Sequence, residues 1–315
     1  GLPADDAANK KFKTLQAAYA AAPAGTEAKP TVIGIKPNVY QLPGGAPRTP
    51  SMDIRKNWIT FLGLPNNRRS VVLADNRGNQ QGAEDNGYIL EVNATGFTLR
   101  NLTVINYCNN DYEYPGNPGK NLKRRSNVIT QAVPLQCQGD KHVYENVAFL
   151  SQLDTTFIRT TRSYFKNVFI EGTDDWMGGG QMSVWEDSTL VYSIGHGVMS
   201  ASNIVFFNCR FEAPRGQQFY KVKYGAGSRP VVLINCVVPF GTSWGRGRFP
   251  PRTNQYSLTY HVTYPDGKPA RIPDGTVGPQ TFDSGRELAE SELPAYNPWN
   301  LLRAPANGPV DDWDP

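Results

Sequence analysis

Two aspartates and one glutamine stand at nearly regular intervals in this chain: Gln131, Asp154 and Asp175, separated by 23 and 21 residues. When two carboxyl groups lie close together, it is unfavourable for both to be ionised at once, so one can serve as an acid while the other stays anionic. Such a pair can supply a general acid/base and a nucleophile, and a nearby amide can donate hydrogen bonds to a developing oxyanion. This chemistry requires a fold that places the three side chains side by side.

A ten-residue pattern that recurs along the chain predicts such a fold. Its fifth position is Asn or Asp, and its third and eighth positions are apolar. The copies are FTLRNLTVIN (97–106), HVYENVAFLS (142–151), SYFKNVFIEG (163–172), SVWEDSTLVY (183–192), IVFFNCRFEA (204–213) and VVLINCVVPF (231–240). Their fifth positions are 45, 21, 20, 21 and 27 residues apart. Spacings near 20 residues are typical of solenoids, in which each repeat forms one coil.

The apolar positions change parity at the fifth residue of each copy. Side chains of a single strand alternate between faces, so this change indicates two short strands that meet at a corner. Asn tolerates the unusual backbone angles of such a corner. The sequence therefore predicts an all-β fold, a single-stranded right-handed parallel β-helix, with the handedness that crossover connections normally take.

The coil register predicts where the polar residues lie. Asp154 and Asp175 each follow a corner residue, Asn146 and Asn167, by eight positions, which places them on neighbouring coils. The gap of 45 residues before Asn146 fits two coils with a degenerate corner near Lys123, and Gln131 follows that position by eight. We therefore expect Gln131, Asp154 and Asp175 to form one column.

The whole chain, 1–315, is expected to form a single domain. Apolar residues at helical spacing predict a capping helix over about 10–22, because Phe12, Leu15 and Tyr19 share one face. Coils are expected over about 31–241. The Pro-rich remainder, about 242–315, is expected to be an extended tail on the outside.

Composition excludes several classes of function. The formal net charge of +4, without a long basic run, is compatible with an acidic polymer but is no signature of nucleic-acid binding. No apolar stretch is long enough to span a bilayer, and no signal peptide is recognisable. With three His and no CxxC pair, no metal site is expected. Cys209 and Cys236 fall on adjacent coils, where either a disulfide or two buried thiols would fit.

Two blocks of sequence resemble the pectin methylesterase family of carbohydrate esterases. QAVPLQCQGDKHVYENVAFLSQLDTTFI (131–158) resembles the family's run of QAVAL, GDR and a strand ending in QDTL. YFKNVFIEGTDDWMGG (164–179) resembles YxxCxIEGTVDFIFG. Upstream, KFKTLQAAYAAAP, TVIGIKPNVY and GFTLRNLTVINY are similar to its opening helix, first strand and early coil. The resemblance covers roughly residues 10–245.

This resemblance implies a role for each residue of the column. Asp175 matches the nucleophile, Asp154 the general acid/base and Gln131 an oxyanion-hole amide. The implied cycle passes through an acyl-enzyme anhydride and uses no cofactor and no metal. The implied substrate is methyl-esterified homogalacturonan or a related pectic polysaccharide. We expect a monomer that is secreted or periplasmic, with its signal peptide removed.

The chain departs from the family pattern at two places. Leu153 stands where the family has a second oxyanion Gln, and the neighbouring Gln152 should point to the other face. The family's GRPW, whose Arg holds the nucleophile, has no clear counterpart; Lys223 is the first candidate and Arg229 the second. A Lys would offer a point charge instead of a planar fork. The expected substrate-binding residues are Lys223, Arg229, Trp176, Trp244, His196 and Gln152.

Two other readings compete with an esterase. A polygalacturonase-like glycoside hydrolase also has an Asp pair, then GHG, then RIK, and this chain has Asp174-Asp175, Gly195-His196-Gly197 and Lys221-Val222-Lys223 in that order. It lacks that family's NTD motif. Alternatively, loss of the second Gln and of the Arg would fit a non-catalytic pectin-binding β-helix.

Overall fold

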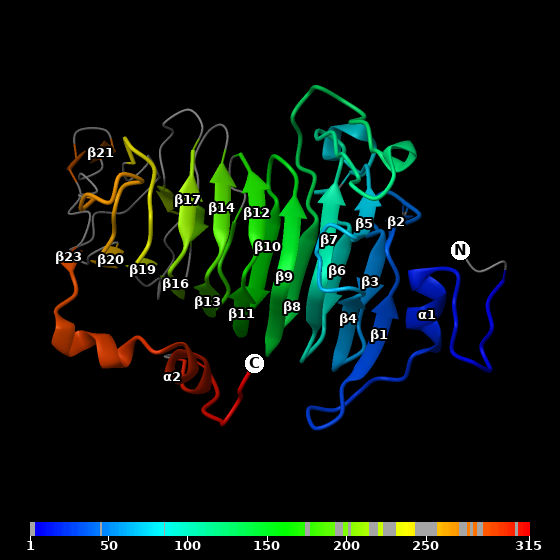
Figure 1. The fold of residues 1–315 in the computed structure, drawn as a ribbon, viewed down its shortest axis with the longest axis horizontal. Coiled ribbons are helices and arrows are strands. Elements are labelled where there is room, and N and C mark those ends of the chain that lie inside the picture. Colours follow the sequence, from blue (N-terminus) through cyan, green and yellow to red (C-terminus); the bar gives the residue numbers. More distant parts are fainter. Residues whose placement is uncertain are drawn as a thin grey trace.

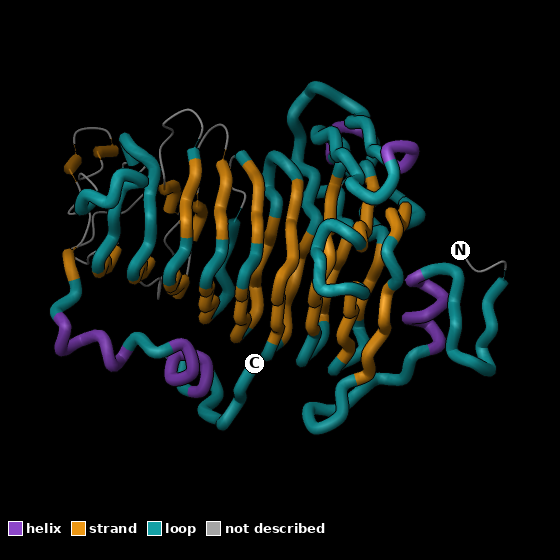
Figure 2. Tube along the Cα trace, viewed as in Figure 1, coloured by secondary structure: helices purple, strands orange, loops and turns teal. Residues whose placement is uncertain are grey.

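The chain folds into stacked coils whose walls are rows of parallel strands (Figures 1 and 2). This computed structural model describes residues 4–44, 46–84, 86–173, 177–192, 198–200, 203–213, 220–222, 231–242, 257–270, 276–277, 280–281, 286–305 and 308–315. Each coil contributes one strand to a row, so residues one coil apart become direct neighbours. The predicted parallel β-helix is confirmed.

The first row carries the first strand of each coil. It contains β1 (Thr31–Ile35), β4 (Ile59–Gly63), the first half of β7 (Thr98–Asn106), the first half of β9 (His142–Leu150), β11 (Arg162–Lys166), β13 (Met182–Glu186), β16 (Asn203–Phe207), β19 (Val231–Ile234), β20 (Ser257–Tyr260) and β23 (Arg286–Glu287).

Two further rows complete the walls. The second contains β2 (Asn38–Gln41), β5 (Val71–Asp75), the second halves of β7 and β9, β12 (Phe169–Gly172), β14 (Thr189–Tyr192) and β17 (Arg210–Glu212). The third contains β3 (Met52–Ile54), β6 (Leu90–Asn93), β8 (Leu135–Gly139) and β10 (Thr156–Thr160). Two short pairs remain, β15 (Val198–Ser200) with β18 (Tyr220–Val222) and β21 (Thr276–Val277) with β22 (Gln280–Thr281).

The corners between the first and second rows lie where the sequence predicts them. All six predicted corner residues have a φ between 50° and 59°, in the left-handed region that Asn adopts more readily than most residues. The Asn146 amide donates to Asn101 Oδ1 at 3.0 Å, and the Asn167 amide donates to Asn146 Oδ1 at 3.2 Å. The ladder of amides therefore holds successive corners in register.

The interior is filled by the third and eighth residues of each repeat. These side chains are buried on every coil of the pattern. The rings of Tyr144 and Phe165 stack with centroids 4.6 Å apart, and those of Phe165 and Trp185 stack at 3.9 Å. Close stacking along the axis gives these three coils a large buried aromatic area.

The expectation of a degenerate coil near Lys123 is wrong. Strand β7 pairs directly with β9, with Leu99 opposite Tyr144, so one coil separates Asn101 from Asn146. Residues 107–130 form an inserted loop instead, here called the 107–130 loop. It rises beyond the ends of β5 and β7 in Figure 1 and contains the short 3-10 helix η2 (Pro118–Lys120). Its Tyr114 and Leu122 pack against the outer face of the second row.

The stacking also continues past residue 241, where the coils were expected to end. Strand β20 pairs in parallel with β19, and β23 pairs with β20. His261 occupies the corner that follows β20, with a φ of 48°, where the earlier coils of the pattern have Asn or Asp. This coil departs from the repeat in two places, because His261 is its corner residue and Thr259 stands in the apolar third position.

The N-terminal helix α1 spans Leu15–Ala21, shorter than the expected 10–22. Thr14 is the N-cap of this helix, since its side-chain oxygen accepts a hydrogen bond from the Ala17 amide at 3.1 Å. The helix lies at the end of the solenoid beside β1 (Figure 1). Tyr19 Oη accepts hydrogen bonds from the Arg55 and Lys56 amides, which ties the helix to the first coils.

The C-terminal segment runs back along the outside of the first row. It contains a 3-10 helix, η3 (Glu290–Ala295), and α2 (Pro298–Arg303), which lies beneath β11 and β13 in Figure 1. Another 3-10 turn, η1 (Asn79–Gln81), lies beside Gln131, whose backbone oxygen accepts a hydrogen bond from the Asn79 amide at 3.0 Å. The ring of Trp299 lies 5.7 Å from that of Tyr164, and Leu302 is fully buried. The expected outer packing of the tail is seen for these residues.

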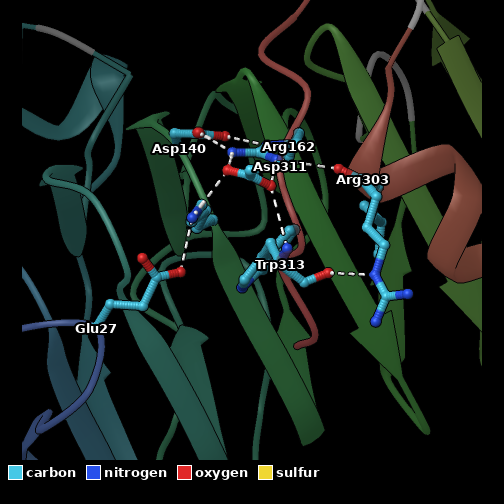
Figure 3. A network of polar contacts seen from close by, with 8 residues as sticks. Glu27, Asp140, Arg162, Arg303, Asp311 and Trp313 are labelled. Atoms are coloured by element: carbon cyan, nitrogen blue, oxygen red, sulfur yellow. Dashed lines mark hydrogen bonds and ion pairs between the residues drawn. The ribbon is translucent and has the colours of Figure 1, made fainter.

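A buried arginine anchors the end of this tail. Arg162 on β11 donates to both carboxylate oxygens of Asp140, at 2.9 and 2.6 Å, and to both of Asp311, at 2.6 and 3.0 Å (Figure 3). Lys141 adds ion pairs to Asp311 at 3.0 Å and to Glu27 at 2.6 Å. The hydrogen bonds from Arg162 hold the pKa of Asp311 well below its usual range.

All four cysteines are buried free thiols. Of the two alternatives for Cys209 and Cys236, a disulfide or two buried thiols, the structure has the two thiols. Within the described ranges, no helix combines the length and apolar character needed to cross a membrane. The same part of the chain holds no group of three or more His, Cys, Asp or Glu side chains placed to bind a metal ion.

Candidate active site

Asp154 lies in the turn that connects β9 of the second row with β10 of the third. Its backbone is left-handed, with a φ of 61°, and the residue is almost buried, with 9% of its surface exposed. Two buried hydroxyls hold the turn: Ser151 Oγ donates to the Ala132 oxygen at 2.5 Å, and Thr155 Oγ1 donates to the Glu171 oxygen at 2.8 Å. The Asp154 turn is thereby fastened to the coil on either side.

Gln131 lies on the coil before Asp154, as expected, but in a slightly different register. It forms a parallel bridge with Leu153, one residue before Asp154, and the Ala132 amide donates to the Leu153 oxygen at 3.3 Å. Asn79 donates from its backbone to the Gln131 backbone oxygen at 3.0 Å, and its side-chain nitrogen lies 3.5 Å from Gln131 Oε1. The oxygen end of the Gln131 amide therefore faces Asn79.

The coil after Asp154 runs in register with it on both sides of the turn. The Thr173 amide donates to the Gln152 oxygen at 2.8 Å, and Met177 forms a parallel bridge with Thr156. Asp175 stands between Thr173 and Met177 in sequence as Asp154 stands between Gln152 and Thr156. Asp175 itself lies outside the described residues, together with the other predicted site residues Trp176, His196, Lys223, Arg229 and Trp244.

Gln152 has its side-chain amide bound to the 107–130 loop. Its Nε2 donates to the Asn109 backbone oxygen at 2.9 Å and to Asn110 Oδ1 at 2.8 Å. These two hydrogen bonds fasten the inserted loop to the strand end that leads into Asp154. Gln152 remains a predicted substrate-binding residue.

Asn109 fastens the other end of that loop. Its side chain is 2% exposed; its Nδ2 donates to the backbone oxygens of Ser126 and Val128 at 3.0 and 2.6 Å. Its Oδ1 accepts a hydrogen bond from the Thr130 amide at 3.2 Å. Because Thr130 precedes Gln131, Asn109 connects the segment that carries Gln131 with the turn that carries Asp154.

Two glycines that follow Asp175, Gly178 and Gly180, differ in how closely the neighbouring coil approaches them. A Cβ on Gly180 would lie 2.0 Å from the Thr160 backbone oxygen, so this residue is glycine because two coils approach closely there. A Cβ on Gly178 would meet nothing closer than 3.7 Å. Gly178 is thus free of the packing requirement that applies to Gly180.

An aromatic side chain that the sequence did not single out follows Asp154 by three residues, on β10. Phe157 is half-buried on the outer face of the third row, with its ring edge-to-face against Tyr88 at 6.3 Å between centroids. The guanidinium carbon of Arg159 lies 5.8 Å from the Phe157 ring centroid. The alternation in DTTFIRT could have indicated this face, since Phe157 and Arg159 are two residues apart on one strand.

Comparison with known proteins places this arrangement in a family context. Among curated relatives, a probable pectinesterase/pectinesterase inhibitor of Arabidopsis thaliana is 23% identical over 96% of this chain and 50% of its own length. A pectinesterase of Ralstonia nicotianae is 28% identical over 62% of this chain and 51% of its own length. The chain spans about half the length of the curated relatives it matches.

Solved structures show the same fold. Pectin methylesterase from carrot superposes with a TM-score of 0.66 at 20% identity, over 92% of this chain and 89% of that one. A pectin methylesterase in complex with a hexasaccharide gives a TM-score of 0.68 at 19% identity, over 100% and 99% of the two chains. The Pectinesterase family model matches residues 3–214, which include Gln131, Asp154 and Asp175. The chain therefore belongs to the pectinesterase family.

Proposed function

We propose that this protein hydrolyses galacturonate methyl esters in pectic polysaccharide and releases methanol. Membership of the pectinesterase family supports the reaction class. The observation that carries the assignment of residues is the Asp154 turn: a nearly buried carboxyl group with Gln131 on one adjacent coil and the Thr173–Met177 segment on the other. Pectic polymers are too large to enter cells, so we expect the protein to act outside the cytoplasm.

In this proposal Asp175 attacks first. A carboxylate oxygen of Asp175 bonds to the ester carbonyl carbon, and the carbonyl oxygen becomes an oxyanion. Protonated Asp154 then gives its proton to the departing methoxide, so methanol leaves and an acyl-enzyme anhydride remains. Asp154, now a carboxylate, takes a proton from water as that water attacks the galacturonate acyl carbon. The acyl–oxygen bond to Asp175 breaks, and both aspartates return to their starting states.

Gln131 is proposed to stabilise the oxyanion. Because the oxygen end of its amide faces Asn79, its Nε2 is the end directed elsewhere and can donate to the substrate. Leu153 cannot supply a second donor of this kind. Removal of Gln131 should then remove most of the side-chain stabilisation and lower kcat by about 100- to 1,000-fold.

Phe157 is proposed to bind the sugar chain next to the reacting ester. Its ring lies three residues beyond Asp154 on the outer face of β10, and aromatic rings pack well against the apolar faces of sugars. Trp176, Trp244 and His196 remain predictions as further substrate contacts. Lys223 and Arg229 remain the predicted cations that keep Asp175 ionised.

The test measures two products from two substrates. Methyl-esterified and de-esterified pectin are each incubated with the protein, and methanol and new reducing ends are quantified. The proposal expects methanol from the esterified polymer without new chain ends, and its loss in Asp154→Asn and Asp175→Asn. Asp187→Asn is the matched control, because Asp187 occupies a corner where other coils already have Asn.

Other outcomes would assign the protein differently. If either active-site variant keeps full methanol release, the column is misassigned. Reducing ends from the de-esterified polymer would identify a glycoside hydrolase. If neither product forms although the polymer is retained on the protein, the chain is a binding module.

A further inference from the structure

A pocket of about 540 Å³ lies between the outer face of the first row and the C-terminal segment, which runs beneath these strands in Figure 1. We call it the tail pocket. The row contributes Phe207, Ile234 and Tyr260 to its lining, and the segment contributes Tyr296 and Asn300. Its volume is within the range of pockets that hold small ligands.

The tail pocket is held open by attachments on both sides. On one side, Arg286 of β23 donates to both carboxylate oxygens of Glu292, at 2.6 Å each. On the other side, the ring of Trp299 contacts that of Tyr164. The span between these attachments contains two prolines, whose rings fix the backbone φ. The segment therefore bridges the wall, and the pocket is formed before any ligand enters.

The outward side chains of the first row change character at the pocket. One column, read along successive coils, consists of Arg100, Glu145, Lys166, Glu186, Phe207, Ile234 and Tyr260. Its first four members alternate in charge, as is usual on a solvated face. Its last three are apolar or aromatic and all line the pocket. The floor of the pocket is therefore apolar.

Two tyrosines add aromatic surface from opposite sides. Tyr260 comes from the wall, and its ring stacks on that of His261 with centroids 3.9 Å apart. Tyr296 comes from the C-terminal segment and packs against the same buried cluster as Tyr260. Aromatic rings that are fixed in this way pack well against the apolar faces of sugars.

Several polar groups at the pocket have no partner within the described part of the protein. Among these residues, no hydrogen bond reaches the hydroxyls of Tyr260 and Tyr296 or the carboxamides of Asn235 and Asn300. Asn235 breaks the ladder of corner amides, since the Asn208 amide still donates to the corner before it at 3.3 Å. The pocket therefore offers hydrogen-bond donors and acceptors beside its aromatic surface.

The charge of the pocket selects the class of ligand. Among the described residues that line it, Glu186 carries the only formal charge, and its carboxylate accepts a hydrogen bond from the Tyr164 hydroxyl. A galacturonate carboxylate would meet this carboxylate and no cation, and burying an unpaired charge is costly. An uncharged pyranose would meet no such cost and would bring hydroxyl groups for the amides.

The tail pocket is separate from the Asp154 turn. Asp154 lies between the second and third rows, on the coil of β9 and β10, whereas the pocket lies on the first row from β13 to β20. A sugar in the pocket is therefore on another wall of the solenoid and does not touch the reacting ester.

We propose that the tail pocket binds an uncharged pyranose unit of a polysaccharide and so holds the protein on carbohydrate independently of ester hydrolysis. Two kinds of polymer present such units, a neutral glycan and a methyl-esterified galacturonan. The inference goes beyond the proposed function and does not depend on it.

Affinity electrophoresis tests this proposal. Native gels contain β-1,4-galactan, hydroxyethyl cellulose, methyl-esterified galacturonan or polygalacturonate, and every protein in the two galacturonan gels also carries Asp175→Asn to prevent turnover. At least one of the three uncharged polymers should retard the parent. Asn300→Ala and Tyr296→Leu should each raise the dissociation constant for that polymer by about tenfold. Neither change should alter retardation by polygalacturonate.

Gln181→Ala is the matched control. Gln181 is an exposed amide just before β13 and lies outside the pocket, so this variant should be retarded like the parent. Asn300 is exposed on α2, where alanine favours the helix, so Asn300→Ala should unfold at the temperature of the parent or above it. Thermal unfolding of each variant checks that a loss of binding is not a loss of fold.

The results distinguish the two kinds of polymer. Loss of retardation by galactan or cellulose in Asn300→Ala would identify a neutral glycan as the ligand. The same loss confined to the esterified galacturonan would assign the site to that polymer. Equal mobility of the parent and Asn300→Ala in all three uncharged polymers would refute the site, and an equal loss with polygalacturonate would refute the argument from charge.

Methanol release separates this inference from the proposed function. Asn300→Ala should keep the kcat and KM of the parent on a short methyl-esterified oligogalacturonate, because the pocket is remote from the reacting ester. If no methanol forms but retardation depends on Asn300, the tail pocket stands without the proposed reaction. If methanol forms but Asn300→Ala does not change retardation, the proposed function stands and the tail pocket is wrong.

Discussion

The side-chain amide of Gln152 donates a hydrogen bond to the backbone oxygen of Asn109 across 2.9 Å. Through this contact, one buried asparagine reaches both halves of the candidate active site. The Asn109 side chain holds the segment that ends at Gln131, and its backbone holds the residue that precedes Asp154 by two. The inserted loop is thus attached to the fold where the chemistry is proposed to occur.

Asn109→Ala should impair catalysis more than substrate binding. The change removes three hydrogen bonds that position the segment before Gln131, and small displacements of a catalytic group cost about 10- to 100-fold in rate. We expect kcat for methanol release to fall by that factor while KM changes little. Asn109→Asp, which keeps the acceptor for the Thr130 amide, should be intermediate.

Asn110→Ala serves as the comparison for Asn109→Ala. It removes one acceptor for Gln152 but leaves the Asn109 oxygen in place, so kcat should stay close to that of the parent. The assays are run well below the unfolding temperature of each variant. An unchanged kcat in folded Asn109→Ala would show that the loop has no positioning role.

His142 should make the protein less stable below pH 6.5. It is fully buried between Tyr144 and the Ala94 oxygen, and burial lowers its pKa to about 4. The unfolded chain therefore binds a proton that the folded chain does not, and stability falls as the pH drops from 6.5 to 4. The loss should total about 3 kcal/mol, since one pKa unit corresponds to about 1.4 kcal/mol.

Denaturant unfolding at several pH values between 4 and 7 measures this dependence. His142→Gln, which can keep a hydrogen bond to the Ala94 oxygen, should have a lower stability at pH 7 but a flatter pH profile. His261→Gln changes an exposed histidine and should leave the profile as it is. A profile that His142→Gln does not flatten would place the acid sensitivity elsewhere.

The C-terminal tail should detach at a lower pH than the range in which His142 lowers stability. Hydrogen bonds from Arg162 depress the pKa of Asp311, so the stabilisation is present above the ordinary pKa of an aspartate, near 4, and is lost as the pH falls through the lower folded value. Trp313 reports this event, because its ring lies 5.4 Å from the Arg162 guanidinium carbon. Its fluorescence, taken as the difference from Trp313→Phe, should change below pH 4.

Asp311→Asn should show the detached signal already at neutral pH, with little further change in acid. Asp312→Asn removes a neighbouring exposed carboxyl group and should behave like the parent. If the Trp313 signal of Asp311→Asn matches the parent at pH 7, the ion pairs with Arg162 do not hold the tail.

The corners and the interior of this fold could be predicted from the sequence because each depends on one residue type at one place in the coil. Asn146 has to adopt a positive φ and to bond to Asn101, and few side chains do both. The 107–130 loop could not be placed in this way, since a loop outside the stack carries no periodicity. The sequence therefore predicts a coil for these 24 residues, which is wrong. The prediction that Gln131 lies on the coil before Asp154 is still correct.

The residues of the candidate site also differ in whether the repeat could reveal them. Asp154 and Gln131 could be found because the turn between the second and third rows recurs on each coil. Asn109 could not, because its importance lies in contacts within the inserted loop and with Gln152, which no spacing reveals. Phe157 lay within reach, since its strand alternates regularly after Asp154.

The ion pair between Asp311 and Arg162 also constrains the number of coils in the solenoid. The tail leaves the last coils, runs back along the first row and ends on β11 (Figures 1 and 3). One coil more or less between β11 and β23 would shift the tail by the spacing of a strand, about 4.8 Å, and carry Asp311 out of reach of Arg162. The number of coils beyond β11 can therefore change only if the tail is rebuilt as well.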